Sequence, residues 1–137
     1  MFTFQCPEGW TAIASSCYIA LLTTTDSRAT AITMCQNAGG SLAVITDAAE
    51  RDALRSLLPQ VENWLVYVDG TDEALEGTWK TQTGETIQSV PFQGPPGSVD
   101  TFPIGGTDRN CLHMSFNQFV DAFCVSTNGG ALCEINL

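Results

Sequence analysis

Positive charge is scarce in this sequence. Only 5 of its 137 residues are Lys or Arg, against 15 Asp and Glu, which gives a net charge of -10 with His neutral. Such a charge repels phosphate groups, so we expect neither nucleic acid nor an anionic membrane surface as a partner. Acidic residues could instead bind calcium or a basic protein, or only keep a secreted protein soluble.

Long apolar runs are also missing. No stretch approaches the ~20 apolar residues needed to cross a bilayer, so we expect no membrane insertion of this segment. Residues 1–5 are too short for the apolar core of a signal peptide. A chain with paired cysteines and no leader is expected to be a mature segment or an ectodomain, with Met1 added for expression.

The cysteines lack the C-x-x-C spacing from which zinc sites are usually built. Their number is even, which favours three disulfides formed in an oxidising, extracellular compartment. Spacing alone leaves 15 connectivities open. The six are Cys6, Cys17, Cys35, Cys111, Cys124 and Cys133.

Signals for an enzyme are weak. The single histidine, His113, lies in the apolar pattern of residues 111–115, where a packed or half-exposed strand residue is expected. No nucleophile elbow is present. A carboxylate pair could still perform acid–base chemistry, but we predict that the chain is not an enzyme.

The length predicts a single domain over residues 1–137, and the order of the expected elements is α+β. Asp26 or Ser27 caps the first helix, and Asp47 with Glu50 caps the second. The second helix should bury Ala53, Leu54, Leu57 and Leu58. We expect helices at 27–38 and 48–58, a strand pair within 10–22, and strands at 42–45, 64–68, 111–115, 119–124 and 131–135.

A long loop region at about 81–110 shows little helix or strand pattern. It is rich in Gly, Pro, Thr and Asp, and it contains the uncharged stretch FQGPPGS at 92–98. About 30 residues without regular structure in a compact domain are usually functional or disordered. From its composition alone, the loop is either a connector or a binding loop.

The motifs and their order resemble those of the C-type lectin-like domain over nearly the whole chain. The first half matches at Cys6-Pro-Glu-Gly-Trp10, Cys17-Tyr18, Ala31-x3-Cys35 and Gly39-Gly40-Ser-Leu-Ala-Val-Ile45. The centre matches at Thr71-Asp-Glu-Ala-Leu-Glu-Gly-Thr-Trp79, and the end at Cys111, Cys124 and Leu132-Cys-Glu134.

The resemblance implies two helices, two small antiparallel sheets and a ligand site in the long loop. It also implies three disulfide pairs, which are Cys6–Cys17, Cys35–Cys133 and Cys111–Cys124.

Family members that bind sugar do so through a calcium ion, which needs 6–8 oxygen ligands. The family's ligand triplet falls here on Pro95-Pro96-Gly97, and Arg109 stands two residues before Cys111 where the family has Glu. Of the family's Trp-Asn-Asp run only Asp121 remains. The resemblance therefore implies that the calcium-bridged sugar site is degenerate.

A second calcium position of the family matches Asp72, Glu76 and Asn110, with Asp108 close by. Calcium could bind there, although we expect no required cofactor. Alternatively, Asp72 and Glu76 are ordinary turn and surface carboxylates. Arg109 could also pair with one of them and fix the loop without a metal.

We predict an extracellular recognition module that binds a protein or a glycan through its long loop. One alternative is a calcium-dependent lectin with a rearranged site, and a second is an acidic structural or matrix protein. Without a seventh cysteine, an oligomer would be non-covalent. Phe119 and Phe123 are expected in the core. The predicted ligand-binding residues are Phe92, Gln93, Phe102, Asp108, Arg109 and Asp121.

Overall fold

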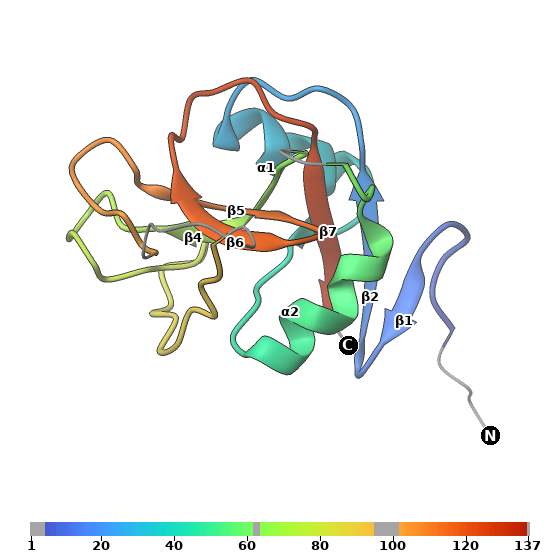
Figure 1. Cartoon of the computed structure of the whole chain (residues 1–137). Helices are drawn as coiled ribbons and strands as arrows, with labels where there is room; N and C mark the ends of the chain where they lie inside the picture. Colours follow the sequence, from blue (N-terminus) through green and yellow to red (C-terminus); the bar gives the residue numbers. More distant parts are fainter. Residues whose placement is uncertain (1–4, 62–63, 95–101, 137) are drawn as a thin grey trace.

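The computed structural model describes residues 5–61, 64–94 and 102–136, and its fold is α+β (Figure 1). No helix of these residues is long and apolar enough to span a bilayer. The helices are α1 (Arg28–Asn37) and α2 (Ala48–Leu54), and a 3-10 turn, Arg55–Leu57, follows α2. The strands are β1 (Thr11–Ile13), β2 (Ser16–Leu21), β3 (Ser41–Leu42), β4 (Val66–Thr71), β5 (Cys111–Ser115), β6 (Gln118–Ala122) and β7 (Ala131–Asn136).

The strands form two antiparallel groups that meet in one sheet. β2 pairs with β1 and β7, and β3 adds to β7. In the second group β5 pairs with β4 and β6. A parallel pairing of Tyr67 with Ala131 joins β4 to β7 and links the groups. The resemblance implied two small antiparallel sheets, and the structure joins two antiparallel groups into one mixed sheet through this parallel pairing.

Side-chain caps begin both helices. The Ser27 hydroxyl accepts the N–H of Thr30 at 3.1 Å, and the Asp47 carboxylate accepts the N–H of Glu50 at 2.7 Å. The Glu50 carboxylate accepts the N–H of Thr46 at 2.9 Å, so the cap fixes the chain entering α2 as well. The expected single helix over 48–58 is instead an α-helix completed by the 3-10 turn, in which 3 residues make one turn.

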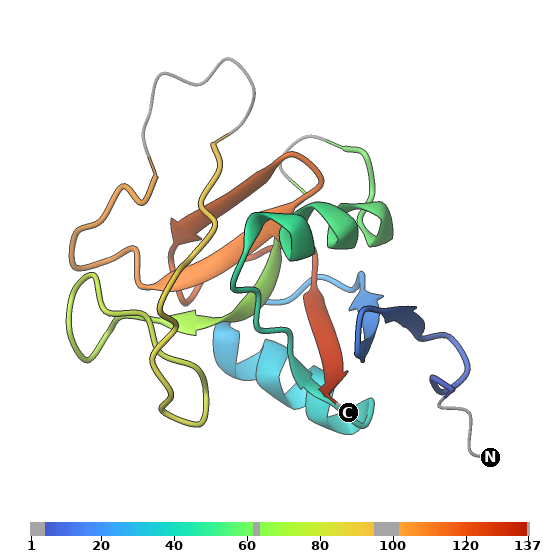
Figure 2. The ribbon, with the colours of Figure 1, turned by 90° about the horizontal axis from the view of Figure 1, so that it is seen from below.

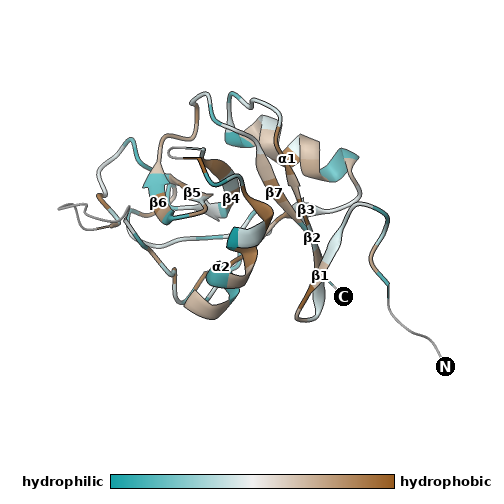
Figure 3. Cartoon of the chain, turned by 45° about the vertical axis from the view of Figure 1, so that its right-hand side comes forward, coloured by the Kyte–Doolittle hydropathy of each residue, from teal (hydrophilic) through white to brown (hydrophobic). Residues whose placement is uncertain are grey.

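Buried apolar residues from the strands and from both helices form the core. The hydropathy colouring shows apolar positions along the strands and on parts of both helices (Figure 3). Phe119 is fully buried, as expected. Phe123 is 44% exposed because it follows the end of β6, so its predicted core position is wrong. Ala53 is also exposed, and the buried contacts of this region come from Leu54 and Leu58.

Three disulfides fasten the sheet to the segments around it, and they are the pairs that the family resemblance implies. Cys6–Cys17 holds the N-terminal segment to β2, and Cys35–Cys133 joins α1 to β7. Cys111–Cys124 joins the start of β5 to the chain just after β6. The 98-residue separation of Cys35 and Cys133 makes this bond the largest restriction on the unfolded chain, in the chain-entropy description.

His113 lies on β5 and is only 1% exposed. Its ring centroid is 4.3 Å from that of Tyr67 on β4, and neither ring nitrogen has a hydrogen-bond partner among the described side chains and backbone. Burial lowers the pKa of His113 to about 4, because the imidazolium would lose its hydration.

We predict that His113 makes the fold acid-sensitive. Its pKa is about 4 in the folded chain and 6.5 unfolded, so between these pH values the unfolded state binds more protons. Stability should fall as pH drops through this window, by roughly 3 kcal/mol in all. Urea unfolding at pH 7 and pH 4.5 would measure this fall. His113→Leu should reduce it, and an equal fall in the variant would contradict the assignment.

Candidate functional site

The described parts of the long chain between β4 and β5, residues 72–94 and 102–110, lie at the end of the molecule away from β1 (Figure 1). It is held to the sheet at several points. Gln93 pairs with Phe119 of β6 through two backbone hydrogen bonds of 2.7 and 2.9 Å. The N–H of Asp72 donates to the carbonyl of Asn110 at 3.1 Å, which ties the first part of the segment to its last residue.

Asp121 is the strongest of these anchors. Its side chain comes from β6 and is fully buried. One carboxylate oxygen accepts the N–H of Ile104 at 2.8 Å, and the other accepts the N–H of Gly105 at 2.7 Å. These short, charge-assisted bonds hold the second part of the long loop against the sheet edge.

Arg109 lies beside the same strand. Its guanidinium donates to the backbone carbonyl of Asp121 at 3.3 Å and stacks over the Phe123 ring, with its central carbon 5.4 Å from the ring centroid. Among the described residues it forms no ion pair, so the pairing with Asp72 or Glu76 considered above is not seen. Arg109 therefore places a positive charge close to Asp121.

This arrangement does not fit the calcium that bridges protein and sugar in this fold. Both oxygens of Asp121 already accept backbone N–H groups, and Arg109 would repel a divalent cation. The triplet match at 95–97 lies outside the described residues.

The second calcium position fits better. Asp72 is 2% exposed, and its Oδ2 accepts the N–H of Gly77 at 2.9 Å while its Oδ1 has no partner. The Asp72 carboxylate is the main cause that raises the pKa of Glu76. The Asn110 amide nitrogen donates to the carbonyl of Thr107 at 2.8 Å, so this hydrogen bond does not use its side-chain oxygen. A calcium ion bound there would gather oxygens from Asp72, Glu76 and Asn110.

The remaining predicted ligand residues have different positions. Phe92 packs edge-on against Trp79 and Phe119, with ring centroids 5.8 and 6.2 Å apart, so it supports the core. Phe102 is half-buried and precedes a cis bond to Pro103. Asp108 is exposed.

Three exposed apolar side chains near these anchors were not predicted. Leu75 is 63% exposed, Ile104 46% and Phe123 44%. The hydrogen bonds to Asp121 and Asn110 bring their three segments to one end of the sheet. Leu75 lies in a turn among acidic residues and a glycine. An apolar residue in such a polar turn is a sequence signal for an exposed apolar side chain. We call Leu75, Ile104, Arg109 and Phe123 the loop-end surface.

One apparent metal cluster carries no site. Glu73 lies near the sulfur atoms of Cys111 and Cys124. Those sulfurs are joined in a disulfide, so no thiolate is available to bind a metal.

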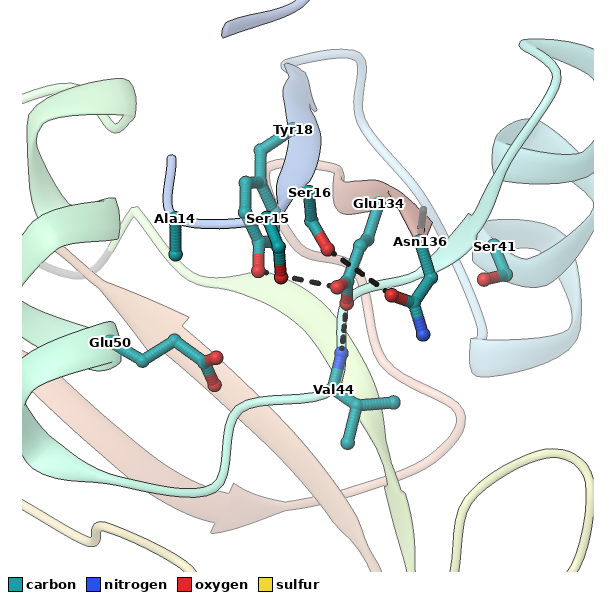
Figure 4. Close-up of a pocket in the computed structure, with 9 residues that line it drawn as sticks. All are labelled: Ala14, Ser15, Ser16, Tyr18, Ser41, Val44, Glu50, Glu134 and Asn136. Carbon is teal, nitrogen blue, oxygen red and sulfur yellow. Dashed lines mark hydrogen bonds between the residues drawn. The ribbon is translucent and has the colours of Figure 1, made fainter. Parts of the chain in front are cut away.

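A separate polar pocket of about 320 Å³ lies between the β1–β2 turn, the end of β7 and the start of α2 (Figure 4). Glu134 accepts the Tyr18 hydroxyl at 3.2 Å and the N–H of Val44 at 3.1 Å. Burial, and then the Glu134 charge, raise the pKa of Tyr18. Burial is also the main cause that raises the pKa of Glu50, to which Glu134 adds. The sequence had identified Glu134 only as part of a family motif.

Comparison with protein families gives one match that covers most of the chain. The family model described as Lectin C-type domain matches residues 24–135. C-type lectin domain family 4 member M of Nomascus concolor is 28% identical over 120 residues, which are 88% of this chain and 29% of that protein. The chain therefore spans less than a third of that relative's length.

Solved structures share the fold. The cow C-type carbohydrate-recognition domain of CD23, crystallised in the presence of a GlcNAc2Man3 oligosaccharide, has a TM-score of 0.71 and 24% identity, with 97% of each chain covered. A calcium-independent type II antifreeze protein has a TM-score of 0.76 and 20% identity, with 98% of this chain and 97% of that chain covered.

We predict that Asp121→Asn destabilises the protein by about 2–3 kcal/mol, because one of two charge-assisted bonds loses its acceptor inside the protein. Chemical denaturation measures the change, and hydrogen exchange should show faster exchange at Ile104 and Gly105. Asp108→Asn is the matched control, since Asp108 is an exposed carboxylate of the same segment. Equal effects of the two substitutions would refute the anchoring role.

Proposed function

The chain belongs to the C-type lectin domain family, and from this we propose that it is an extracellular recognition domain that binds its ligand at the loop-end surface without a calcium-bridged sugar. In this proposal the whole domain is a binding module and not an enzyme. Because disulfides form and persist in oxidising compartments, the three cystines support an extracellular setting.

The observation that carries the proposal is the state of the Asp121 carboxylate. A calcium-bridging Asp must turn an oxygen toward the metal, whereas each Asp121 oxygen is held by a backbone N–H of the loop and the Arg109 guanidinium beside this residue opposes a divalent cation. The loop is thus organised by the protein itself. A ligand would then meet side chains directly, and its binding would not require calcium.

The loop-end surface has the composition of a protein contact. Leu75, Ile104 and Phe123 supply exposed apolar area, and Arg109 is held over an aromatic ring. Aromatic side chains and arginine are enriched at the centres of protein interfaces. We therefore place a protein ligand first and a glycan ligand, held by direct contacts, second.

A calcium-dependent lectin with a rearranged site is the second candidate. It is favoured by the buried Oδ1 of Asp72, which has no hydrogen-bond partner, and by the neighbouring Glu76. Calcium there would support the loop from the side of Asn110.

The direct test is a screen of glycan arrays and extracellular protein libraries, performed once with calcium and once with chelator. Binding that survives chelator and is lost in Leu75→Asp and Ile104→Asp supports the proposal. Val61→Asp is the matched control, since Val61 is 52% exposed in a different part of the chain. Binding that needs calcium, or that is insensitive to both loop-end substitutions, would contradict it.

We predict that calcium does not change the melting temperature of the unmodified protein. Arg109→Glu should create a calcium response, because it replaces the repelling guanidinium near Asp121 by a carboxylate. Differential scanning calorimetry with millimolar calcium and with chelator measures both effects. A rise of several degrees in the unmodified protein would favour the calcium-dependent candidate instead.

A further inference from the structure

A groove runs along one side of the molecule, apart from the loop-end surface. Three cavities of about 320, 340 and 370 Å³ adjoin one another, and Val44 lines all of them. Ser41 and Asn136 line the first and second cavities, while Thr81 and Glu85 line the second and third. We call this continuous depression the Val44 groove.

The groove is built by segments that are distant in the sequence. Figure 2 shows the chain that enters α2 passing between β7 and the loop that follows β4. Val44 lies on this central chain, the β1–β2 turn and β7 form one end, and residues 81–89 form the other. None of the loop-end residues lines any of the three cavities.

The groove has a negative lining along its whole length. Glu50 and Glu134 face the first cavity (Figure 4), and Glu85 lines the second and third. No Lys, Arg or His is among the residues that line these three cavities. Asp69 also reaches the second cavity, but Arg28 neutralises it at 2.7 Å. Glu85, by contrast, is exposed and has no ion pair among the described residues.

The floor of the groove is apolar at its centre and at its far end. Val44 is half-buried, and Ile87 lines the third cavity together with Thr46, Thr81 and Thr86. An extended chain places successive side chains on opposite faces about 3.3 Å apart along its axis. Such a chain could set an apolar side chain over Val44 and direct flanking side chains toward the carboxylates.

We propose that the Val44 groove binds an extended, basic peptide segment of a partner protein. Lysine or arginine side chains meet Glu50 and Glu134 at one end and Glu85 at the other, and an apolar side chain between them covers Val44. Charge complementarity selects this occupant, because the chain carries net charge -10 and the groove lining supplies carboxylates without cations. Binding here is independent of the ligand proposed for the loop-end surface.

An ammonium or guanidinium group suits these carboxylates better than a divalent ion. Both Glu134 oxygens already accept hydrogen bonds, and one Glu50 oxygen accepts the N–H of Thr46. Calcium would need 6–8 oxygens at one point, whereas the Glu85 carboxylate belongs to a different cavity from Glu50 and Glu134. Cationic side chains spaced along a peptide match carboxylates that are spread over separate cavities.

Fluorescence anisotropy with a labelled peptide of alternating Lys and Val tests the proposal, with the corresponding Glu and Val peptide as reference. The Lys peptide should bind, the Glu peptide should not, and added salt should weaken binding. The double variant Glu50→Gln and Glu85→Gln should weaken binding about fivefold to tenfold, as expected for two partly exposed ion pairs. Gln keeps an oxygen for the N–H of Thr46, so the start of α2 stays capped.

The double variant Glu8→Gln and Glu73→Gln is the matched control, because it removes the same two charges from exposed residues outside the groove and should leave the affinity unchanged. Val44→Lys should abolish binding while thermal melting verifies the fold. NMR shifts caused by the peptide should fall on residues 41–50 and 81–89.

The proposal is overturned by no binding at millimolar peptide, or by equal affinities of the double variant and the control. It is also overturned by NMR shifts at the loop-end surface, or by displacement of the peptide by millimolar calcium. Any of these results leaves the loop-end proposal standing, because Leu75→Asp and Ile104→Asp test that surface separately.

Discussion

Carboxylates that accept backbone N–H groups hold the irregular half of this protein in place. Asp121 holds the chain at Ile104 and Gly105, Asp69 holds it at Gln82, and Asp72 holds the turn at Gly77. Glu134, Glu50 and Asp47 do the same for the chain that enters α2. These segments have few ladder hydrogen bonds, so a charged acceptor replaces the regular pairing that a strand would provide.

This use of carboxylates gives the acidic composition a structural meaning. The sequence left open whether the 15 acidic residues served calcium, a basic partner or solubility. Several of them instead bond to the protein's own backbone. Four cations are also placed against acidic residues: Arg28 on Asp69, Arg51 and Arg55 on Asp52, and Arg109 beside Asp121. The negative charges that remain without such partners define the surfaces open to other molecules, and Glu85 of the Val44 groove is one of them.

The regular elements could be predicted from sequence because their signals are local. Ser27 and Asp47 mark the helix starts, and apolar composition marks β4, β5 and β7. The disulfide pairs came from the family resemblance, since spacing left them open. Asp121 could be identified only as a remnant of a calcium site, because its partners lie 16 and 17 residues away in a segment without pattern.

The surfaces were harder to predict for the same reason. Phe123 adjoins a cystine and was expected inside, but β6 ends at Ala122 and the next residue leaves the sheet. The Val44 groove draws its lining from five separate parts of the chain, so no single stretch of sequence records it. The exposure of Phe123 and the shape of the Val44 groove both depend on packing between distant segments. The periodicity of apolar residues within one segment carries no information about such packing.

Both ends of the chain from Gln93 to Ile104 are fastened to β6, at Phe119 and Asp121, which are only two residues apart. The chain therefore leaves the sheet at Gln93 and returns to it at Ile104 at nearly the same place on β6. Doubling the length of a loop between two such fixed points costs only about 0.6 kcal/mol. The paired anchors thus offer an engineer a place to graft foreign sequence onto a cystine-stabilised scaffold.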